Sequence, residues 1–203
     1  MTEVRSRGRP RDPAADTAIL RAGLQLFLER GFEGASIEQI AKRAGVGKLT
    51  VYRRWATKEE LIAAAIEKLV ANKVEWPSDE VIEQVSPFQL VEATLANAAQ
   101  TAAAPEFRAL VGRILGSAVS HPSLMATYWT HYVLPRRALA RLLLERAREQ
   151  GTVDTDADLD ALTDMMAGAV MYRVLQPDPP DVSEMRRYLT ALYRQVGLLP
   201  RPG

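Results

Sequence analysis

The sequence predicts an all-α fold, in which an N-terminal three-helix domain with a helix-turn-helix precedes a larger C-terminal helical domain. Apolar residues recur at helical spacing through most of the 203 residues. Apolar and polar residues rarely alternate as they do in strands, and the chain has no Asn-Gly or Asp-Gly hairpin signal. Glycine, proline and serine residues divide the sequence into segments of helical length.

The composition excludes several classes of protein. With 47% hydrophobic and 25% charged residues, the chain can bury a sizeable core. The absence of cysteine excludes disulfides, thiolate zinc sites and cysteine nucleophiles. No apolar run approaches the ~20 residues that cross a membrane, and the basic N-terminus lacks the apolar segment of a signal peptide. We therefore expect a cytoplasmic protein with no membrane partner.

The charge is distributed unevenly along the chain. The first 58 residues carry a net charge of +6 and the remainder carries −5, which gives +1 overall. A basic N-terminal quarter is typical of proteins that bind a polyanion such as DNA, although a solvated basic surface without a partner has the same composition.

The first two helices are predicted from apolar spacing and from their end signals. Residues 14–30 carry one apolar stripe, and Gly31 is suited to end that helix. Ser36 begins the second helix, and Gln39 lies three residues further on, as in a capping box.

A glycine-containing turn at residues 44–47 joins the second helix to a third, at residues 48–55. Two short helices joined by such a turn form a helix-turn-helix, so the third helix is the candidate recognition helix. Val51 and Trp55 can face the core. Five side chains are then left for a DNA groove and its phosphates: Lys48, Thr50, Tyr52, Arg53 and Arg54. Thr57 and Glu60 form a further capping box, which begins a fourth helix.

The C-terminal region is divided by breaks that contain proline or glycine. Polar turns are expected at residues 76–79 and 86–87. Helices are expected at residues 88–103, 107–119, 123–150, 158–175 and 183–196. Pro105 fits a first helical turn, whereas Pro135 is expected to kink or divide the segment 123–150.

A series of ordered positions extends from Gly8 to about Ile66. They are Ile19, Ala22, Leu26, Phe27, Gly31, Phe32, 36–41, 44–46, Lys48, 50–52, Trp55 and 58–61. Together they resemble the DNA-binding region of the TetR/AcrR family of transcriptional regulators. The resemblance implies a homodimeric repressor that a small molecule releases from a palindromic, double-stranded DNA operator. The family usually has Ser or Thr at Gly47 and a small residue at Leu49, so these two departures make the operator sequence less predictable.

The resemblance also implies which side chains contact DNA. Ser36 and Thr50 would bind phosphate through their hydroxyls, and Lys48 and Arg53 would reach base edges. The remaining implied contacts are Arg9 and Arg11 of the N-terminal arm, with Leu49, Tyr52, Arg54 and Lys58 on or beside the third helix. The arm is alternatively a tail without a role.

We expect a DNA-binding domain over residues 1–58 and a ligand-sensing and dimerisation domain over residues 59–203. The candidate ligand pocket combines methionine and aromatic side chains with one arginine: Phe107, Arg113, Met125, Tyr128, Trp129, Tyr132, Met165, Met166 and Tyr172. The candidate dimer interface lies on the last two helices: Leu159, Leu162, Ala169, Met185, Tyr188, Leu189 and Leu192. Both sets are alternatively ordinary core.

Other classes of protein agree less well with the sequence. His121 and His131 are the only histidines and have no further metal ligand at helical spacing, although they are further candidates for polar anchors in the pocket. The alternating aspartates at residues 154–160 lack the Gly and Glu of a calcium loop. No catalytic or cofactor motif is recognisable, so we expect no enzyme, cofactor or metal site. A DNA-binding regulator or architectural protein with no small-molecule effector remains an alternative.

Overall fold

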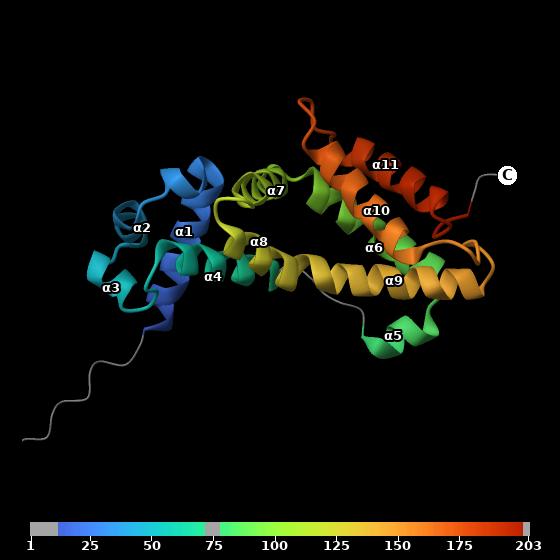
Figure 1. The fold of residues 1–203 in the computed structure, drawn as a ribbon, viewed down its shortest axis with the longest axis horizontal. Coiled ribbons are helices and arrows are strands. Elements are labelled where there is room, and N and C mark those ends of the chain that lie inside the picture. The colour runs from blue at the N-terminus through green and yellow to red at the C-terminus, as the bar shows by residue number, and fades with distance from the viewer. Residues whose placement is uncertain (1–11, 72–77, 201–203) are drawn as a thin grey trace, which may run out of the picture. The chain divides into compact units, whose positions relative to one another are not determined.

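The computed structural model describes residues 12–71 and 78–200, which form helices and no strand (Figure 1). The predicted all-α class is therefore confirmed. The chain divides into two compact units, residues 1–65 and residues 66–203. Among the described helices, none is both long enough and apolar enough to cross a membrane.

The N-terminal unit contains α1 (Pro13–Gly34), α2 (Ile37–Ala44) and α3 (Lys48–Tyr52), with α2 packed between the other two. Gly31 lies at φ 74° and interrupts α1, so the helix breaks where the sequence predicts its end, although a final turn continues to Gly34. The core of this unit consists of fully buried apolar side chains: Ile19, Leu26, Phe27, Ile40, Val51 and Leu61.

The boundary between the units falls within α4 (Lys58–Ala71), further along the chain than the expected boundary after residue 58. The first turns of α4 belong to the N-terminal unit because Leu61 and Ile62 are fully buried there. Both lie over Gly23 of α1, where a Cβ would stand 2.4 Å from Leu61 Cδ2. Gly23 therefore permits the close approach of α1 and α4.

The C-terminal unit is a set of packed helices. They are α5 (Asp79–Gln84), α6 (Pro87–Ala103), α7 (Pro105–Ser117), α8 (Pro122–Tyr128), the π-helical turn η1 (Trp129–Val133), α9 (Leu134–Glu149), α10 (Leu159–Val174) and α11 (Val182–Gln195). α6 lies along α11, and α10 packs against α9. Two clusters of buried apolar residues hold these helices together. One lies around Leu144 and Met166, and the other lies around Val111 and Met185.

The helix α5 was not expected, because the sequence analysis placed only turns between residues 76 and 87. Ser78 begins α5, and its hydroxyl accepts a hydrogen bond from the backbone N–H of Val81 (3.3 Å). Glu80 lies in the first turn, where a negative charge interacts favourably with the positive end of the helix dipole. The expectation was wrong because Ser78 caps a helix and does not lie in a continuous turn.

Pro135 was expected to kink or divide the segment 123–150, and the structure shows an irregularity at this point but no break in the helical backbone. Pro135 occupies the first turn of α9, and the chain forms the wider turn η1 immediately before it. Proline has no N–H for the helical ladder, so the preceding turn must satisfy its carbonyls in another way. The side chain of Arg136, the residue after the proline, donates from Nη1 to the carbonyl of Tyr132 (3.0 Å).

Candidate functional site

The helix-turn-helix of the N-terminal unit has the predicted turn and the predicted caps. Gly45 adopts the left-handed conformation (φ 70°, ψ 27°), and Val46 N–H donates to the carbonyl of Ala41 (3.0 Å). The Ser36 hydroxyl accepts from the backbone N–H of Gln39 (3.2 Å). These local hydrogen bonds and the glycine turn fix the orientation of α3 relative to α2.

One face of α3 is buried and the other is open to solvent. Val51 is completely buried, whereas Leu49 and Tyr52 are 64% and 44% exposed. Lys48 and Arg53 are exposed on the same helix and its C-cap. α3 therefore presents two cations, a phenol and a leucine to solvent, and no carboxylate of its own.

The side chain of Lys48, the first residue of α3, contacts both α2 and α3. Its Nζ pairs with the carboxylate of Glu38 and stands 5.7 Å from the centre of the Tyr52 ring. The hydrogen bond from Lys48 lowers the pKa of Glu38, and the same bond raises the pKa of Lys48. Both side chains are exposed, so water screens the pair and Lys48 can exchange Glu38 for another anion. The sequence analysis did not name Glu38 among the DNA-contacting side chains, because sequence spacing does not show the contact between α2 and α3.

Arg54 and Lys58 point into the N-terminal unit. The guanidinium of Arg54, only 12% exposed, pairs with Asp16 of α1 and donates to the carbonyl of Thr50 (3.1 Å). Lys58 Nζ donates to the carbonyl of Phe32 (2.7 Å) and stands 4.1 Å above that ring. These two cations tie α3 and α4 to α1, whereas Lys48 and Arg53 face solvent.

The other predicted DNA-contacting residues differ in how exposed their side chains are and in whether the structure describes them. Thr50 and Ser36 are half-exposed, and the Ser36 hydroxyl is engaged as the helix cap. Gly47 begins α3 without a side-chain cap, and a Cβ there would meet only Thr50 Oγ1, at 3.9 Å. Arg9 and Arg11 lie outside the described residues.

In the C-terminal unit, three of the predicted pocket residues form an aromatic cluster. The rings of Tyr128 and Tyr132 stack with centroids 4.8 Å apart, and Phe107 lies 6.0 Å from Tyr132. Arg136 stands 3.4 Å above the centre of the Tyr132 ring, although the sequence analysis did not name it. Its position four residues after Tyr132 was a usable signal, because residues at that spacing share a helix face.

The remaining pocket candidates lie elsewhere or are only partly buried. Met166 belongs to the core cluster around Leu144. Trp129, Met165 and Tyr172 are 43%, 62% and 72% exposed. Arg113, Met125 and His121 are half-buried. His131 is exposed, and its Nε2 lies 3.9 Å from the carboxylate of Glu67 in the last turns of α4.

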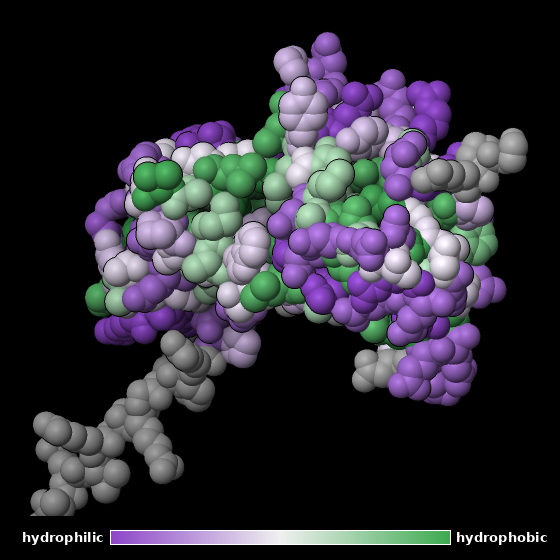
Figure 2. Space-filling model, turned by 45° about the vertical axis from the view of Figure 1, so that its right-hand side comes forward, coloured by the Kyte–Doolittle hydropathy of each residue, from purple (hydrophilic) through white to green (hydrophobic). Residues whose placement is uncertain are grey.

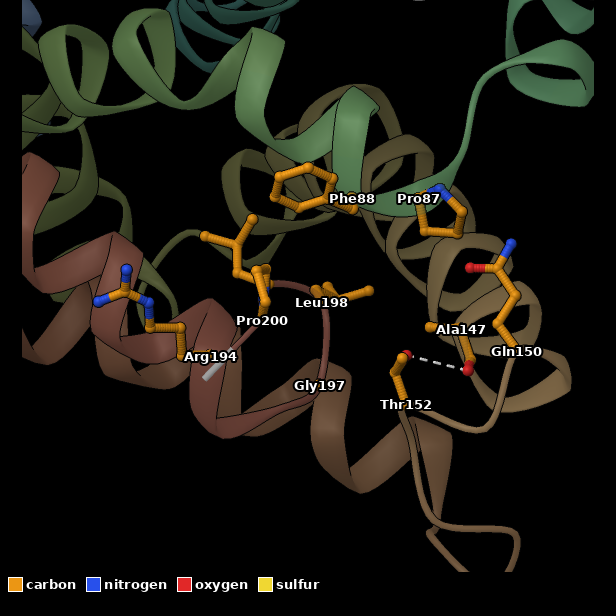
Figure 3. Close-up of a pocket in the computed structure, with 10 residues that line it drawn as sticks. Pro87, Phe88, Ala147, Gln150, Thr152, Arg194, Gly197, Leu198 and Pro200 are labelled. Atoms are coloured by element: carbon orange, nitrogen blue, oxygen red, sulfur yellow. Dashed lines mark hydrogen bonds between the residues drawn. The ribbon is translucent and has the colours of Figure 1, made fainter. Parts of the chain in front are cut away.

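A cavity of about 390 Å³ lies at the other end of the C-terminal unit, where the start of α6 meets the end of α11 (Figure 3). Phe88, Leu198 and Pro200 form apolar walls, and Thr152 donates from its hydroxyl to the carbonyl of Ala147 (3.0 Å). None of the residues predicted to line a ligand pocket lines this cavity.

The predicted dimer residues are largely covered by their own chain. Leu159, Met185 and Leu189 are at most 4% exposed. The others are half-buried: Leu162, Ala169, Tyr188 and Leu192. Hydrophobic side chains nevertheless reach the surface of the C-terminal unit among hydrophilic ones (Figure 2). On α10 the exposed apolar or small residues are Ala161, Met165, Gly168 and Tyr172.

The alternating aspartates act locally. Asp158 begins α10, and its carboxylate accepts from the N–H groups of Asp160 and Ala161 (3.0 Å each). Asp154 accepts from the N–H of Asp156 (3.0 Å). Within residues 12–71 and 78–200, no group of three or more His, Asp or Glu side chains is arranged to hold a metal ion.

Two family profiles match the chain. Residues 19–65 match the family described as bacterial regulatory proteins, tetR family. Residues 91–192 match the family described as tetracyclin repressor-like, C-terminal domain. The matched segments cover the helix-turn-helix and most of the C-terminal unit.

Individual relatives extend the similarity over most of the chain. The HTH-type transcriptional regulator YdeS of Bacillus subtilis is 30% identical over 169 residues, which cover 83% of this chain and 82% of YdeS. Among solved structures, GusR of Salmonella enterica superposes with a TM-score of 0.69 at 23% identity, over 96% of this chain and 100% of GusR. A transcriptional regulator of Saccharomonospora viridis in complex with choline superposes with a TM-score of 0.72 at 17% identity, over 90% and 96% of the two chains.

Proposed function

Because the chain belongs to the TetR family of HTH-type transcriptional regulators, we propose that it is a repressor which leaves a palindromic operator when a small molecule binds its C-terminal unit. The observation that carries the DNA-reading part is the solvent-facing side of α3, where Lys48 and Arg53 stand beside exposed Leu49 and Tyr52. Long cations reach guanine edges in the major groove, and apolar side chains contact thymine methyl groups.

We assign separate roles to the side chains of the helix-turn-helix. Lys48 and Arg53 read base edges, and Leu49 contacts a thymine methyl. Thr50, Tyr52 and Ser36 hold phosphates. Arg54 and Lys58 act through the positions of α3 and α4, because their internal partners already hold them.

The effector site is proposed at the aromatic cluster of Phe107, Tyr128 and Tyr132. The contact between His131 and Glu67 links η1, next to this cluster, to the last turns of α4 (3.9 Å). A ligand that prefers another arrangement of η1 would bias α4 and with it the recognition helix, by no more than its difference in affinity for the two states. The choline complex of the Saccharomonospora viridis regulator supports a small-molecule effector, since it shows that a protein of this fold holds one.

A homodimer is part of the proposal, because one short recognition helix reads half of a palindrome. We place the contact on the exposed side of α10 rather than on the buried Leu159, Met185 and Leu189. Ala161, Met165, Gly168 and Tyr172 are spaced four, three and four residues apart and thus form one seam along the helix.

The first experiment is selection of bound sequences from random duplexes, with the salt dependence of binding measured on the enriched fraction. We expect a palindrome to be enriched. Arg53→Ala should weaken binding to it by about tenfold or more and relax the preference at one base pair of each half-site. Arg187→Ala is the matched control, because it removes the same charge from a side chain of α11 that is 77% exposed.

If no sequence is enriched and binding falls steeply as salt rises, the proposed repressor function is contradicted. The protein would then be a non-specific architectural protein. An enriched palindrome that Arg53→Ala and Arg187→Ala affect equally would preserve the regulator but remove Arg53 from base recognition.

A further inference from the structure

We propose that the effector is an organic anion with an apolar body, which the Tyr128 hydroxyl and the Arg136 guanidinium hold by its carboxylate. The inference rests on the proposed small-molecule response and adds the chemical class of the ligand. It is carried by one unpartnered hydroxyl and one cation on the same aromatic cluster.

Tyr128 carries the first observation. Its side chain is 1% exposed, and its hydroxyl has no hydrogen-bond partner in the structure. A buried hydroxyl without a partner is destabilising by about 1–3 kcal/mol, so proteins rarely keep one without a use. Burial raises the pKa of Tyr128, which keeps the hydroxyl protonated and able to donate. The hydroxyl is therefore suited to a ligand that supplies an acceptor.

Arg136 determines the sign of the ligand's charge. Its guanidinium lies over the Tyr132 ring, on the face that would otherwise attract a cation. A quaternary ammonium would lose that ring face and meet the positive charge of the arginine. A carboxylate instead pairs with the guanidinium in a forked geometry. Arg136 also donates through Nη1 to the Tyr132 carbonyl, which holds the guanidinium at the aromatic cluster.

The place of the cluster gives the ligand a route to α4. Tyr128 ends α8, Tyr132 lies in η1, and Arg136 lies in the first turn of α9, so a ligand that bridges Tyr128 and Arg136 spans the π-helical turn. Such single turns are less regular than an α-helix and often occur at functional sites. His131 in the same turn lies 3.9 Å from Glu67 of α4. Binding at the cluster is thereby coupled to α4 within the C-terminal unit.

The first test needs no ligand. Tyr128→Phe in the full chain should leave the melting temperature unchanged or raise it, because it removes a hydroxyl that bonds to nothing in the free protein. Tyr188→Phe is the matched control, since the Tyr188 hydroxyl donates to the carbonyl of Ala169 (3.2 Å) and its loss should lower the melting temperature. An equal fall in both variants would overturn the inference, because Tyr128 would then have a structural partner.

The second test uses two probes, phenylacetate and choline, at millimolar concentration. Phenylacetate should raise the melting temperature of the wild type, less so in Tyr128→Phe, and not in Arg136→Gln. Arg136→Lys keeps the charge and should retain part of the effect. Choline should produce no shift. Three results would each refute the proposal that the effector is an anion. They are a larger rise in melting temperature with choline than with phenylacetate, no rise with phenylacetate, and a rise with phenylacetate that is undiminished in Arg136→Gln.

These outcomes are separate from those of the proposed function. A protein that selects a palindrome but does not respond to phenylacetate remains a DNA-binding regulator, with the ligand class refuted. If the protein binds phenylacetate through Tyr128 and Arg136 but selects no duplex, the proposed anion site is supported and the proposed repressor function is refuted.

Discussion

At the recognition helix, an exposed carboxylate stands beside a cation that is expected to read DNA. Glu38 of α2 pairs with Lys48 of α3, and both side chains are about half exposed or more. A pair of this kind adds little stability. In a complex it would place a negative charge near phosphates, so Glu38 opposes DNA binding unless it also orients Lys48.

We therefore predict that Glu38→Gln strengthens binding to the selected duplex by roughly threefold at low salt. The gain should shrink as salt rises, because screening weakens the repulsion that the substitution removes. Fluorescence anisotropy at two salt concentrations measures both effects. Weaker binding by the variant would contradict the expectation and indicate that Glu38 orients Lys48 for a base contact.

For Arg53 and Arg54, the residue type and its position in the helix were not enough to predict where the side chain lies. The sequence placed Arg53 and Arg54 on one outward face, yet only Arg53 is exposed. Arg54 turns inward because Asp16, far away in the sequence, lies beside it in the fold. Helical spacing gives the direction of a Cβ, but the partner of a long flexible side chain depends on which other helix packs nearby.

At the scale of the elements, the end of α11 depends on one glycine. Gly197 lies at φ +79°, and a Cβ there would stand 2.2 Å from the carbonyl oxygen of Thr152. The loop after α9 and the segment after α11 therefore approach too closely for any side chain.

Gly197→Ala should lower the free energy of unfolding by about 2 kcal/mol or more, through both the backbone strain and the clash. Gly116→Ala is the control, because Gly116 lies in α7 and, apart from the backbone of its own helix and its two chain neighbours, no atom lies within 4 Å of the added Cβ. That change should be stabilising by about 0.5–1 kcal/mol. Urea unfolding of both variants measures the difference, and equal stability would show that the contact at Gly197 yields without strain.

Helix ends were predicted best where a cap is local in sequence. Ser36, Gly45 and Pro135 each act on neighbouring residues, and each lies where the sequence put it. The second capping box is only partly as expected. The Thr57 hydroxyl accepts from Glu60 N–H (3.1 Å), but the Glu60 carboxylate accepts from Ala56 N–H (2.9 Å) rather than from Thr57.

At the scale of the whole molecule, assembly depends on which apolar faces the subunit leaves open. The sequence showed wide apolar stripes on the last two helices. The structure covers Met185 and Leu189 with α6 and its neighbours, and leaves Met165 and Tyr172 exposed.

Tyr172→Asp should convert the proposed dimer into a monomer, because it places a charge in the apolar seam of α10. Affinity for the palindrome should fall by about a hundredfold, since the two half-sites would no longer be bound together. Sedimentation velocity and anisotropy measure the two effects. Val81→Asp, on the 41% exposed Val81 of α5, is the control and should change neither. A Tyr172→Asp dimer would place the interface elsewhere.

The sequence by itself determined the helical class, the helix-turn-helix and the solvent-facing cations of α3, because helical periodicity, caps and turns act over a few neighbouring residues. Only the tertiary structure decided that Arg54 and Lys58 turn inward and that the Tyr128 hydroxyl is buried without a partner. The contacts of Arg54 and Lys58 join residues far apart in the sequence, and the burial of Tyr128 depends on the side chains packed around it. Both features are determined by packing, which a one-dimensional pattern does not contain.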